Sequence, residues 1–465
     1  MNDRRIRSIR TKKNDRNNSY VLYWMQQAQR VHYNHALDHA IRIANRKGLP
    51  LVVYFGLTED YPEANERHYA FMLEGLKEVE RFLSKLGIAF VVKKGSPEQA
   101  ILPLLKKSEA LVMDEGYLRT ARTWRKRVVE YVVDSDMDIL IDAVDTDLIV
   151  PVRIASDRAE YGAYTIRPKI RRIYQDFRDF SHLSIYHGLH YQKIASDLDL
   201  SDPERALAGL DLDRSVRRSR YFKGGYIEAS RRITAFLEER IERYQDSNDP
   251  GLDLTSKLSP YLHFGQISAL EILERVLLAV EQQRVDGQGV DAFIEQLLIR
   301  RELAFNYVFY QEGYDRFRTM TEDWAYRTMA EHEGDERPAL YSLKEIEAGR
   351  TDDPYFNAAM KEMALTGYMH NYMRMYWAKR IIEWSADYRT AYKRILTLNN
   401  KYFIDGRDPN SYAGVAWCFG KHDRAWTERP VFGKLRYMNA NGLKRKFAIE
   451  DYVSRIESLS DDDMI

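Results

Sequence analysis

The sequence has little cysteine, no long apolar run and almost no net charge. Its 465 residues include one cysteine, Cys418, which excludes a disulfide framework and a cysteine-ligated zinc site and suits a reducing compartment. The longest apolar stretch, residues 49–57, is far shorter than the roughly 20 residues that cross a membrane. Lys and Arg number 71 against 70 Asp and Glu, so the net charge of +1 excludes a polycation. We expect a soluble cytoplasmic protein, associated with the nucleoid if its source is prokaryotic.

The usual fingerprints of nucleotide binding and hydrolysis are also missing. No GxGxxG follows a candidate strand, and no GxxxxGK, HExxH or GxSxG occurs. The 11 histidines show no metal-ligand spacing, so we expect no metal site. A chain without hydrolytic residues of its own points to chemistry that a bound cofactor carries out.

The first third of the chain alternates short apolar runs with longer amphipathic stretches. This alternation is typical of an α/β domain with a doubly wound parallel sheet, because parallel neighbours need a crossover helix. The apolar runs predict strands at residues 20–24, 51–57, 88–92, 110–113 and 139–143. The amphipathic stretches predict helices at residues 30–46, 66–86, 97–106 and 119–133.

Composition divides the chain into four parts. Residues 1–19 carry seven Lys or Arg within the first 16 positions and are predicted to be a basic flexible arm. Residues 20–150 should form the α/β domain. Residues 151–225 are polar and interrupted by Pro and Gly, which indicates an inter-domain linker with a helix near residues 170–179. Residues 226–465 have helical periodicity almost throughout and predict a larger all-α domain.

Four stretches of the helical part are richer in polar and aromatic residues than core packing requires. They cover residues 255–268, 369–384, 399–417 and 421–447. The hydroxyl groups of the first stretch suit a phosphate, the second places Met and Trp on one helix face, and the third is a turn-rich polar loop. Each of these three also has an ordinary explanation, namely a helix cap, core packing and a surface turn.

The fourth stretch concentrates positive charge. Residues 421–447 contain eight Lys or Arg and two acidic residues, a local charge of +6, with four aromatic residues interleaved. Cations neutralise phosphates and aromatic faces stack on unpaired bases, so this composition favours a nucleic-acid surface. A solvated charged face is the alternative.

These motifs together resemble the class II cyclobutane pyrimidine dimer photolyases of the photolyase/cryptochrome superfamily. The resemblance covers most of the chain and rests on LSPYLHFGQIS, MRMYWAKRIIEW, DGRDPNSYAG and HDRAW, with YWM in the first predicted strand. They begin at residues 258, 373, 405, 422 and 23. The resemblance implies an α/β domain followed by a larger all-α domain that binds FAD without a glycine-rich loop.

The resemblance also implies which residues bind FAD. The diphosphate and ribityl chain would be lined by Tyr244, Thr255, Ser256, Leu258 and Ser259. Arg374 and Asp405 would form an ion pair beside the isoalloxazine ring, and Asn399 would face its N5 atom. The remaining pocket residues would be Asn371, Trp377, Gly406, Arg407 and Asn410.

The implied reaction is the light-driven splitting of thymine dimers by a carbon–carbon lyase. Excited FADH⁻ would give one electron to a dimer flipped out of double-stranded DNA, and the electron would return after the ring opens. Glu302 would bind the dimer carbonyls and stabilise the radical anion. The residues that pack on the flipped bases would be Met375, Trp417 and Trp426. Those that hold backbone phosphates or fill the gap left in the duplex would be Arg424, Arg436, Lys444, Arg445 and Lys446. The protein would act as a monomer.

The chain departs from the family pattern at two places. The tryptophan relay that reduces the flavin would start at Trp377 and end at Trp384, but its middle position holds Phe356, for which Tyr355 or Tyr376 could substitute. The triplet at residues 300–302 is Arg-Arg-Glu where relatives have Trp-Lys-Glu. An antenna chromophore, a deazaflavin or a folate, stays open.

Two other functions compete with repair. A cryptochrome-like blue-light photoreceptor would use the same flavin fold without repair activity. A light-independent module that binds structured nucleic acid would explain the basic stretch but would leave the flavin motifs without a role.

Overall fold

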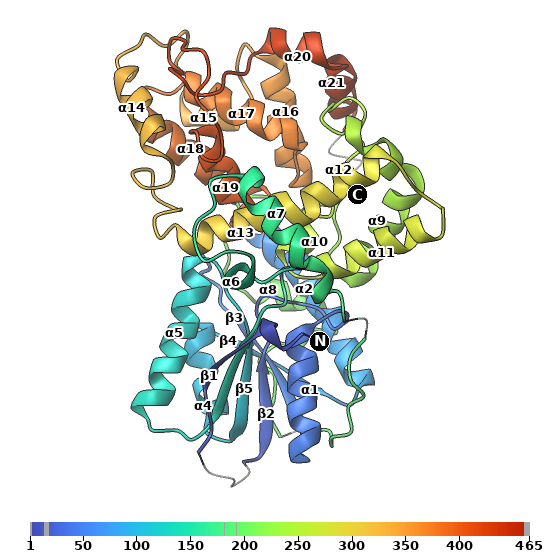
Figure 1. The fold of residues 1–465 in the computed structure, drawn as a ribbon. Coiled ribbons are helices and arrows are strands. Elements are labelled where there is room, and N and C mark those ends of the chain that lie inside the picture. Colours follow the sequence, from blue (N-terminus) through green and yellow to red (C-terminus); the bar gives the residue numbers. More distant parts are fainter. Residues whose placement is uncertain (1, 14–17, 181, 192, 460–465) are drawn as a thin grey trace.

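The computed structural model describes residues 2–13, 18–180, 182–191 and 193–459. Figure 1 shows an α/β domain with a helical domain stacked on the end of its sheet. The sheet has six strands in the order β1-β6-β5-β2-β3-β4. The strands are β1 (Ile6–Arg10), β2 (Tyr20–Trp24), β3 (Leu51–Leu57), β4 (Ala89–Lys94), β5 (Ser108–Asp114) and β6 (Leu140–Val144). Five of them run parallel, and β1 pairs antiparallel with β6.

Helices cover both faces of the sheet, as the sequence predicts for a doubly wound fold. They are α1 (His35–Lys47), α2 (Glu66–Lys85), α3 (Pro97–Ala100), α4 (Leu102–Leu105) and α5 (Arg119–Asp134). The single helix predicted at residues 97–106 is two short helices, because Pro103 lacks the N–H that would continue the first one. Every residue of β2 and β3 is buried, which explains their continuous apolar sequences.

The prediction of a flexible arm over residues 1–19 is wrong for residues 3–10. They form a 3-10 turn, η1 (Asp3–Arg5), and the edge strand β1. Arg5 is only 2% exposed and donates to the carbonyls of Leu148 at 2.8 Å and Ile149 at 2.6 Å. Basic residues suggested solvent, but this guanidinium satisfies backbone carbonyls in the interior. Residues 14–17 of the arm lie outside the described residues.

The segment predicted as a linker is packed against the molecule along much of its length. It contains α6 (Val152–Ala155), α7 (Ala163–Ile173), η2 (Tyr174–Phe177) and α8 (Pro203–Ala208). The main helix, α7, starts at Ala163, before the predicted range of residues 170–179, and it contains Pro168. Leu198, Leu200 and Leu207 join a core cluster with Phe55 of β3. The second half of the segment therefore covers the α/β domain.

The helical domain supplies the walls of the site described below. Its first helices are α9 (Tyr226–Glu239), η3 (Ile241–Asp246), α10 (Ser259–His263), α11 (Ala269–Glu281), α12 (Gln288–Ile294), the π-helical turn η4 (Glu295–Arg300) and α13 (Arg301–Tyr310). The others are α14 (Asp323–Glu331), α15 (Leu343–Glu347), α16 (Pro354–Thr366), α17 (Asn371–Glu383), α18 (Tyr388–Tyr402), α19 (Pro409–Cys418), α20 (Ala440–Lys446) and α21 (Ile449–Glu457). Within the described part of the chain, no helix is both long and apolar enough to span a membrane.

Candidate cofactor cavity and nucleic-acid face

The helical domain encloses a cavity at the place that the sequence motifs predict. Its walls come from the loop before α10, from η4, and from α17, α18 and α19. Eleven of the thirteen residues predicted to bind FAD line it, namely Tyr244, Thr255, Ser256, Leu258, Ser259, Asn371, Arg374, Trp377, Asn399, Asp405 and Asn410. Residues more than 160 positions apart in the sequence therefore meet in one cavity.

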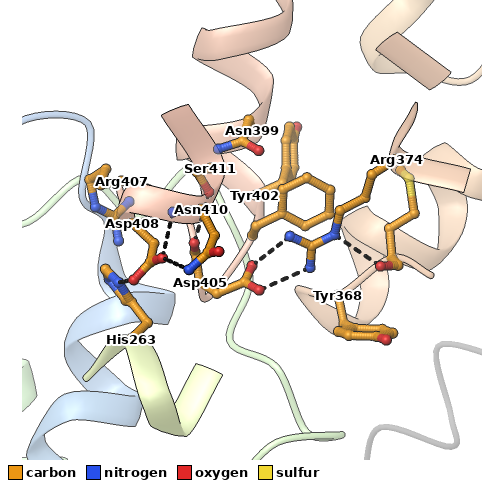
Figure 2. A network of polar contacts seen from close by, with 12 residues as sticks. His263, Tyr368, Arg374, Asn399, Tyr402, Asp405, Arg407, Asp408, Asn410 and Ser411 are labelled. Atoms are coloured by element: carbon orange, nitrogen blue, oxygen red, sulfur yellow. Dashed lines mark hydrogen bonds and ion pairs between the residues drawn. The ribbon is translucent and has the colours of Figure 1, made fainter. Parts of the chain in front are cut away.

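An ion pair between α17 and the loop before α19 forms part of the cavity wall, and Figure 2 shows its two side chains. The guanidinium of Arg374 contacts the two carboxylate oxygens of Asp405 at 3.0 and 3.1 Å. Its Nε donates to the carbonyl of Met369 at 2.9 Å, and its centre lies 4.0 Å from the ring of Phe403. This paired geometry holds both charges in a mostly buried place, as the predicted ion pair beside a flavin ring requires.

A second polar group in the wall was not predicted from the sequence. Asp408 caps α19 by accepting from the backbone N–H and side-chain amide of Asn410, and it lies 3.1 Å from Nδ1 of His263 (Figure 2). Burial alone would raise the pKa of Asp408, but the hydrogen bond to His263 and the charge of Arg301 hold it below its ordinary value. His263 stands inside the LSPYLHFGQIS motif, which was the available signal.

Asn399 and Trp377 face the cavity from α18 and α17. The side-chain amide of Asn399 donates to Oδ1 of Asn400 at 3.0 Å. The indole N–H of Trp377 points to the sulfur of Met360 at 2.9 Å, which fixes the plane of the ring. Each side chain is therefore held by a hydrogen bond to a neighbouring side chain, and each lines the cavity.

Two residues predicted to bind FAD lie elsewhere. Arg407 turns toward the α/β domain, where its Nη1 donates to the carbonyl of Asn400 at 2.6 Å and lies 3.2 Å from Nε2 of His68. Gly406 packs against the end of α18, where an added Cβ would come within 2.9 Å of two backbone oxygens. The motif places both correctly in the loop, but backbone geometry aims them away from the cavity.

Glu302 does not line the cavity, which contradicts the prediction that it contacts the dimer. Its Oε1 accepts the backbone N–H groups of Ile149 at 2.7 Å and Val150 at 3.1 Å. The residue is 2% exposed, and burial raises its pKa to about 8 against the opposing effects of these N–H groups and of Arg301. Glu302 therefore joins the helical domain to the end of the α/β domain.

The π-helical turn η4, which directly precedes α13, explains why the side chain of Glu302 points away from the cavity and not, as the sequence predicts, into it. A π turn inserts one extra residue and rotates the following side chains around the helix. Gln296, Leu297 and Arg301 consequently face the cavity, and the next residue faces the domain interface. No sequence signal marks such a turn.

The proposed relay residues form a partial chain. Phe356 packs on Trp384 with ring centroids 5.0 Å apart, and Trp384 packs on Tyr341 at the same distance. The two tyrosines considered as substitutes are engaged elsewhere, since Tyr376 donates to Asp353 and Tyr355 donates to Glu450. Phe356 therefore contacts the last relay residue, Trp384, whereas the ring of Trp377 packs on Phe403 with centroids 6.4 Å apart.

Aromatic and basic residues predicted to contact DNA form a cluster that continues from α19. The guanidinium of Arg436 lies 4.1 Å from the ring of Trp426 and 5.1 Å from that of Trp417, and it is paired with Asp423. Arg424 lies 5.0 Å from the ring of Trp426 on the exposed side. We call these residues the Trp417 cluster. Met375, which lines the cavity, lies 3.9 Å from Cys418, the neighbour of Trp417.

The remaining basic residues of the stretch divide into exposed and buried ones. Lys444, Arg445 and Lys446 are exposed in the last turn of α20. Lys421, which contributed to the local charge of +6, is buried and paired with Glu322. The charge that can meet a phosphate is therefore smaller than the sequence suggests.

A second, smaller cavity lies at the carboxyl ends of the parallel strands. It is lined by residues after β2, by the end of β3 and the residues that follow it, and by residues of α2, α5 and the helical domain: Gln26, Gln27, Gln29, Phe55, Gly56, Leu57, Thr58, Tyr61, Ala64, His68, Tyr69, Met72, Ala121, Trp124, His263, Phe264 and Arg407. Asp114 at the end of β5 accepts the backbone N–H groups of three residues after β2. The connections of the sheet reverse direction at β2, and such switch points are where α/β folds bind ligands.

Comparison with known proteins identifies the family. Residues 21–185 match the family model of DNA photolyase, and residues 293–464 match that of the FAD binding domain of DNA photolyase. A deoxyribodipyrimidine photo-lyase of Methanothermobacter thermautotrophicus is 44% identical over 98% of this chain and 99% of that protein. Those of Arabidopsis thaliana and Potorous tridactylus are each 38% identical, over 94% and 95% of this chain and 89% and 82% of those proteins. The chain belongs to the DNA photolyase family.

Solved structures agree on the fold of this photolyase family member. A class III photolyase from Agrobacterium tumefaciens has a TM-score of 0.73 at 18% identity, covering 95% of this chain and 87% of that one. A cryptochrome of Synechocystis has a TM-score of 0.73 at 16% identity, covering 97% and 92%. The predicted family, fold class and FAD cofactor are confirmed. Among the described residues, no three His, Cys, Asp or Glu are grouped to hold a metal ion.

We expect Asp405→Asn to lower both stability and FAD content. The substitution leaves the guanidinium of Arg374, whose side chain is 17% exposed, without its counter-charge, at a cost of about 3 kcal/mol. Thermal unfolding and flavin absorbance after purification measure the two effects. The control is Asp136→Asn, which removes a 99% exposed partner of Arg10 and should cost less than about 1 kcal/mol. Equal flavin content and stability in Asp405→Asn and the parent would contradict a supporting role for this ion pair.

We expect Glu302→Gln to flatten the dependence of stability on pH. The pKa of Glu302 is about 8 in the folded protein against an ordinary 4.5, so the unfolded chain releases this proton first. The free energy of unfolding therefore falls as pH rises from about 4.5 to about 8, by up to about 1.4 kcal/mol per pH unit. Glutamine stays neutral and removes this contribution. Unfolding midpoints across that range measure it, and parallel curves for variant and parent would refute the raised pKa.

Proposed function

We propose that this protein repairs cyclobutane pyrimidine dimers in DNA by a light-dependent reaction at FAD bound in the helical cavity. The supporting observation is that the Arg374–Asp405 pair and Trp377 stand in the cavity wall, while the Trp417 cluster begins on α19, a helix of the same wall. The names of the relatives point to the same reaction. The proposal includes a monomer that acts on double-stranded DNA in the cytoplasm.

The residues present fit FAD. The hydroxyl groups of Thr255, Ser256 and Ser259 and the amide of Asn371 supply donors for a diphosphate and a ribityl chain. Bound FAD in its reduced FADH⁻ form would supply, on excitation, the electron that opens the cyclobutane ring. Asp405 and Arg374 would orient the ring system, and the apolar walls at Trp377 and Met375 would exclude water from it.

Gln296 replaces Glu302 as our candidate for recognition of the dimer. It lines the cavity from η4, and its amide has N–H donors for carbonyl oxygens that gain negative charge. Met375, Trp417 and Trp426 would pack on the flipped bases, while Arg424 and Arg436 would contact the DNA beside them. Lys444, Arg445 and Lys446 would meet backbone phosphates farther along.

The second cavity is our candidate for an antenna chromophore, a deazaflavin or a folate. It lies at the switch point of the sheet and contains an aromatic pair, Tyr61 and Trp124, with ring centroids 5.9 Å apart. Aromatic walls suit a planar ring system. A second absorbance band that Trp124→Ala removes without loss of FAD would support this assignment, and an unchanged spectrum would refute it.

The experiment that tests the main proposal is a light-against-dark assay on DNA with a thymine dimer, using chemically reduced protein. We expect dimers to disappear only under blue light. Prior reduction bypasses Phe356, so a negative result cannot be caused by failed photoreduction. If the protein binds reduced FAD but does not repair the dimer, the proposal is overturned and the photoreceptor function is favoured. The Synechocystis cryptochrome has the same fold as this chain.

We expect Phe356→Trp to accelerate reduction of the flavin in light. Indole is oxidised more easily than a phenyl ring, and position 356 packs on Trp384 at 5.0 Å. Photoreduction of the oxidised protein with an external thiol measures the rate, for which we expect an increase of at least about tenfold, equal to about 1.4 kcal/mol of barrier. The control is repair by pre-reduced variant and parent, which should be equal. An unchanged photoreduction rate would show that electrons do not pass through position 356.

A further inference from the structure

Two exposed aromatic side chains lie at the start of α7. Tyr161, just before the helix, is 41% exposed, and Tyr164 in its first turn is 64% exposed. Their ring centroids are 6.1 Å apart. Large aromatic side chains left in solvent as neighbours are uncommon on a monomer surface and indicate a contact site.

Three arginine side chains on α7 and η4 share one carboxylate. Arg167 and Arg171 of α7 and Arg300 of η4 all approach the one carboxylate of Glu295, at 2.7, 3.7 and 3.6 Å. One negative charge cannot neutralise three guanidinium groups, so two positive charges remain. The side chains of Arg171 and Arg300 are 63% and 53% exposed.

Helical spacing places these groups on one surface. Tyr164, Arg167 and Arg171 stand at positions i, i+3 and i+7 and therefore share a face of α7. We call Tyr161, Tyr164, Arg167, Arg171 and Arg300 the α7 strip. At about 1.5 Å per residue the helix is roughly 16 Å long, which matches about five base pairs of duplex.

The α7 strip is continuous with the proposed DNA face on two sides. The hydroxyl of Tyr161 donates to the carbonyl of Asp423 at 3.2 Å, and the carbonyl of Tyr161 lies 2.8 Å from Nδ1 of His422. These bonds tie the strip to the loop that carries Arg424, Trp426 and Arg436. On the other side α7 packs against η4, which lines the cavity through Gln296.

We propose that the α7 strip binds the backbone of the duplex that flanks the dimer. This inference rests on the proposed function, because a duplex that delivers a base pair into the cavity must lie across the surfaces beside it. Exposed guanidinium groups would contact phosphates, and the tyrosines would pack on sugars or on bases exposed by the flipped dimer. The strip would therefore strengthen binding of duplex DNA and add nothing to binding of an isolated dimer.

The test compares a long and a short substrate. We would prepare Arg171→Glu and Tyr164→Ala, with Lys126→Glu as the control, a charge reversal at a 76% exposed site on α5. Affinity for a dimer-containing duplex of about 20 base pairs would be measured at several salt concentrations. Repair of a thymine dimer dinucleotide, too short to reach α7, would be measured with reduced protein under blue light.

We expect Arg171→Glu to weaken duplex binding about tenfold and to lower the salt slope by about 1 for each phosphate that is no longer neutralised. Tyr164→Ala should weaken binding with an unchanged slope, and Lys126→Glu should bind as the parent does. Dinucleotide repair and flavin content should be the same in all proteins. Parent-like duplex affinity of both α7 variants, or an equal loss on the dinucleotide, would overturn the inference. Failure of the parent to repair either substrate would instead overturn the proposed function, and duplex binding would still test the strip.

Discussion

Buried arginines of the α/β domain donate to backbone carbonyls of the helical domain and fix the two domains relative to each other. The shape of the cavity depends on this fixed arrangement. Arg67 of α2 donates to the carbonyls of Met363 and Tyr402 in the helical domain, at 3.2 and 2.8 Å. Arg30 reaches the carbonyls of Gly265 at 3.0 Å and Thr146 at 2.6 Å. Burial lowers the pKa of Arg67 to about 10, so it stays charged at neutral pH. A buried guanidinium deprived of its carbonyl acceptors would be strongly destabilising, so the interface has little freedom to slide.

This constraint reaches the cavity through a single helix. Arg301 and Glu302 are neighbours on α13, but Arg301 lines the cavity and donates to the carbonyl of Asp147 at 2.9 Å, while Glu302 binds the N–H groups of Ile149 and Val150. One side of α13 therefore lines the cavity, and another side forms part of the interface between the two domains. The residue that the family pattern suggests as catalytic instead supports the wall from behind.

Sequence reasoning succeeded where a pattern has one physical cause. The strand β2 was predicted at its observed residues because a buried parallel strand must be apolar throughout. The pairing of Arg374 with Asp405 was implied by the family resemblance, and it agrees with the need of a mostly buried arginine for a counter-charge. It failed where the outcome depends on local backbone geometry. The π turn redirected Glu302, the conformation of the loop aimed Arg407 at His68, and Arg5 entered the interior because backbone carbonyls accept its N–H groups there. None of these three has a signature in composition or spacing.

The helix α19 connects the cavity to the Trp417 cluster, and both ends of the helix have charged side chains as partners. Asp408 caps its start beside His263, while the buried ammonium of Lys379 donates to the carbonyl of Cys418 at its end, at 2.6 Å. An anion at the start and a cation at the end both complement the helix dipole, so the helix is stabilised at each side of the site. Burial lowers the pKa of Lys379 to about 8, and the same group lies 5.8 Å from the ring of Trp417. A change that moved Trp417 would therefore also move the helix that carries Asn410 and Ser411 into the cavity wall, so the Trp417 cluster and the cavity depend on the position of one helix.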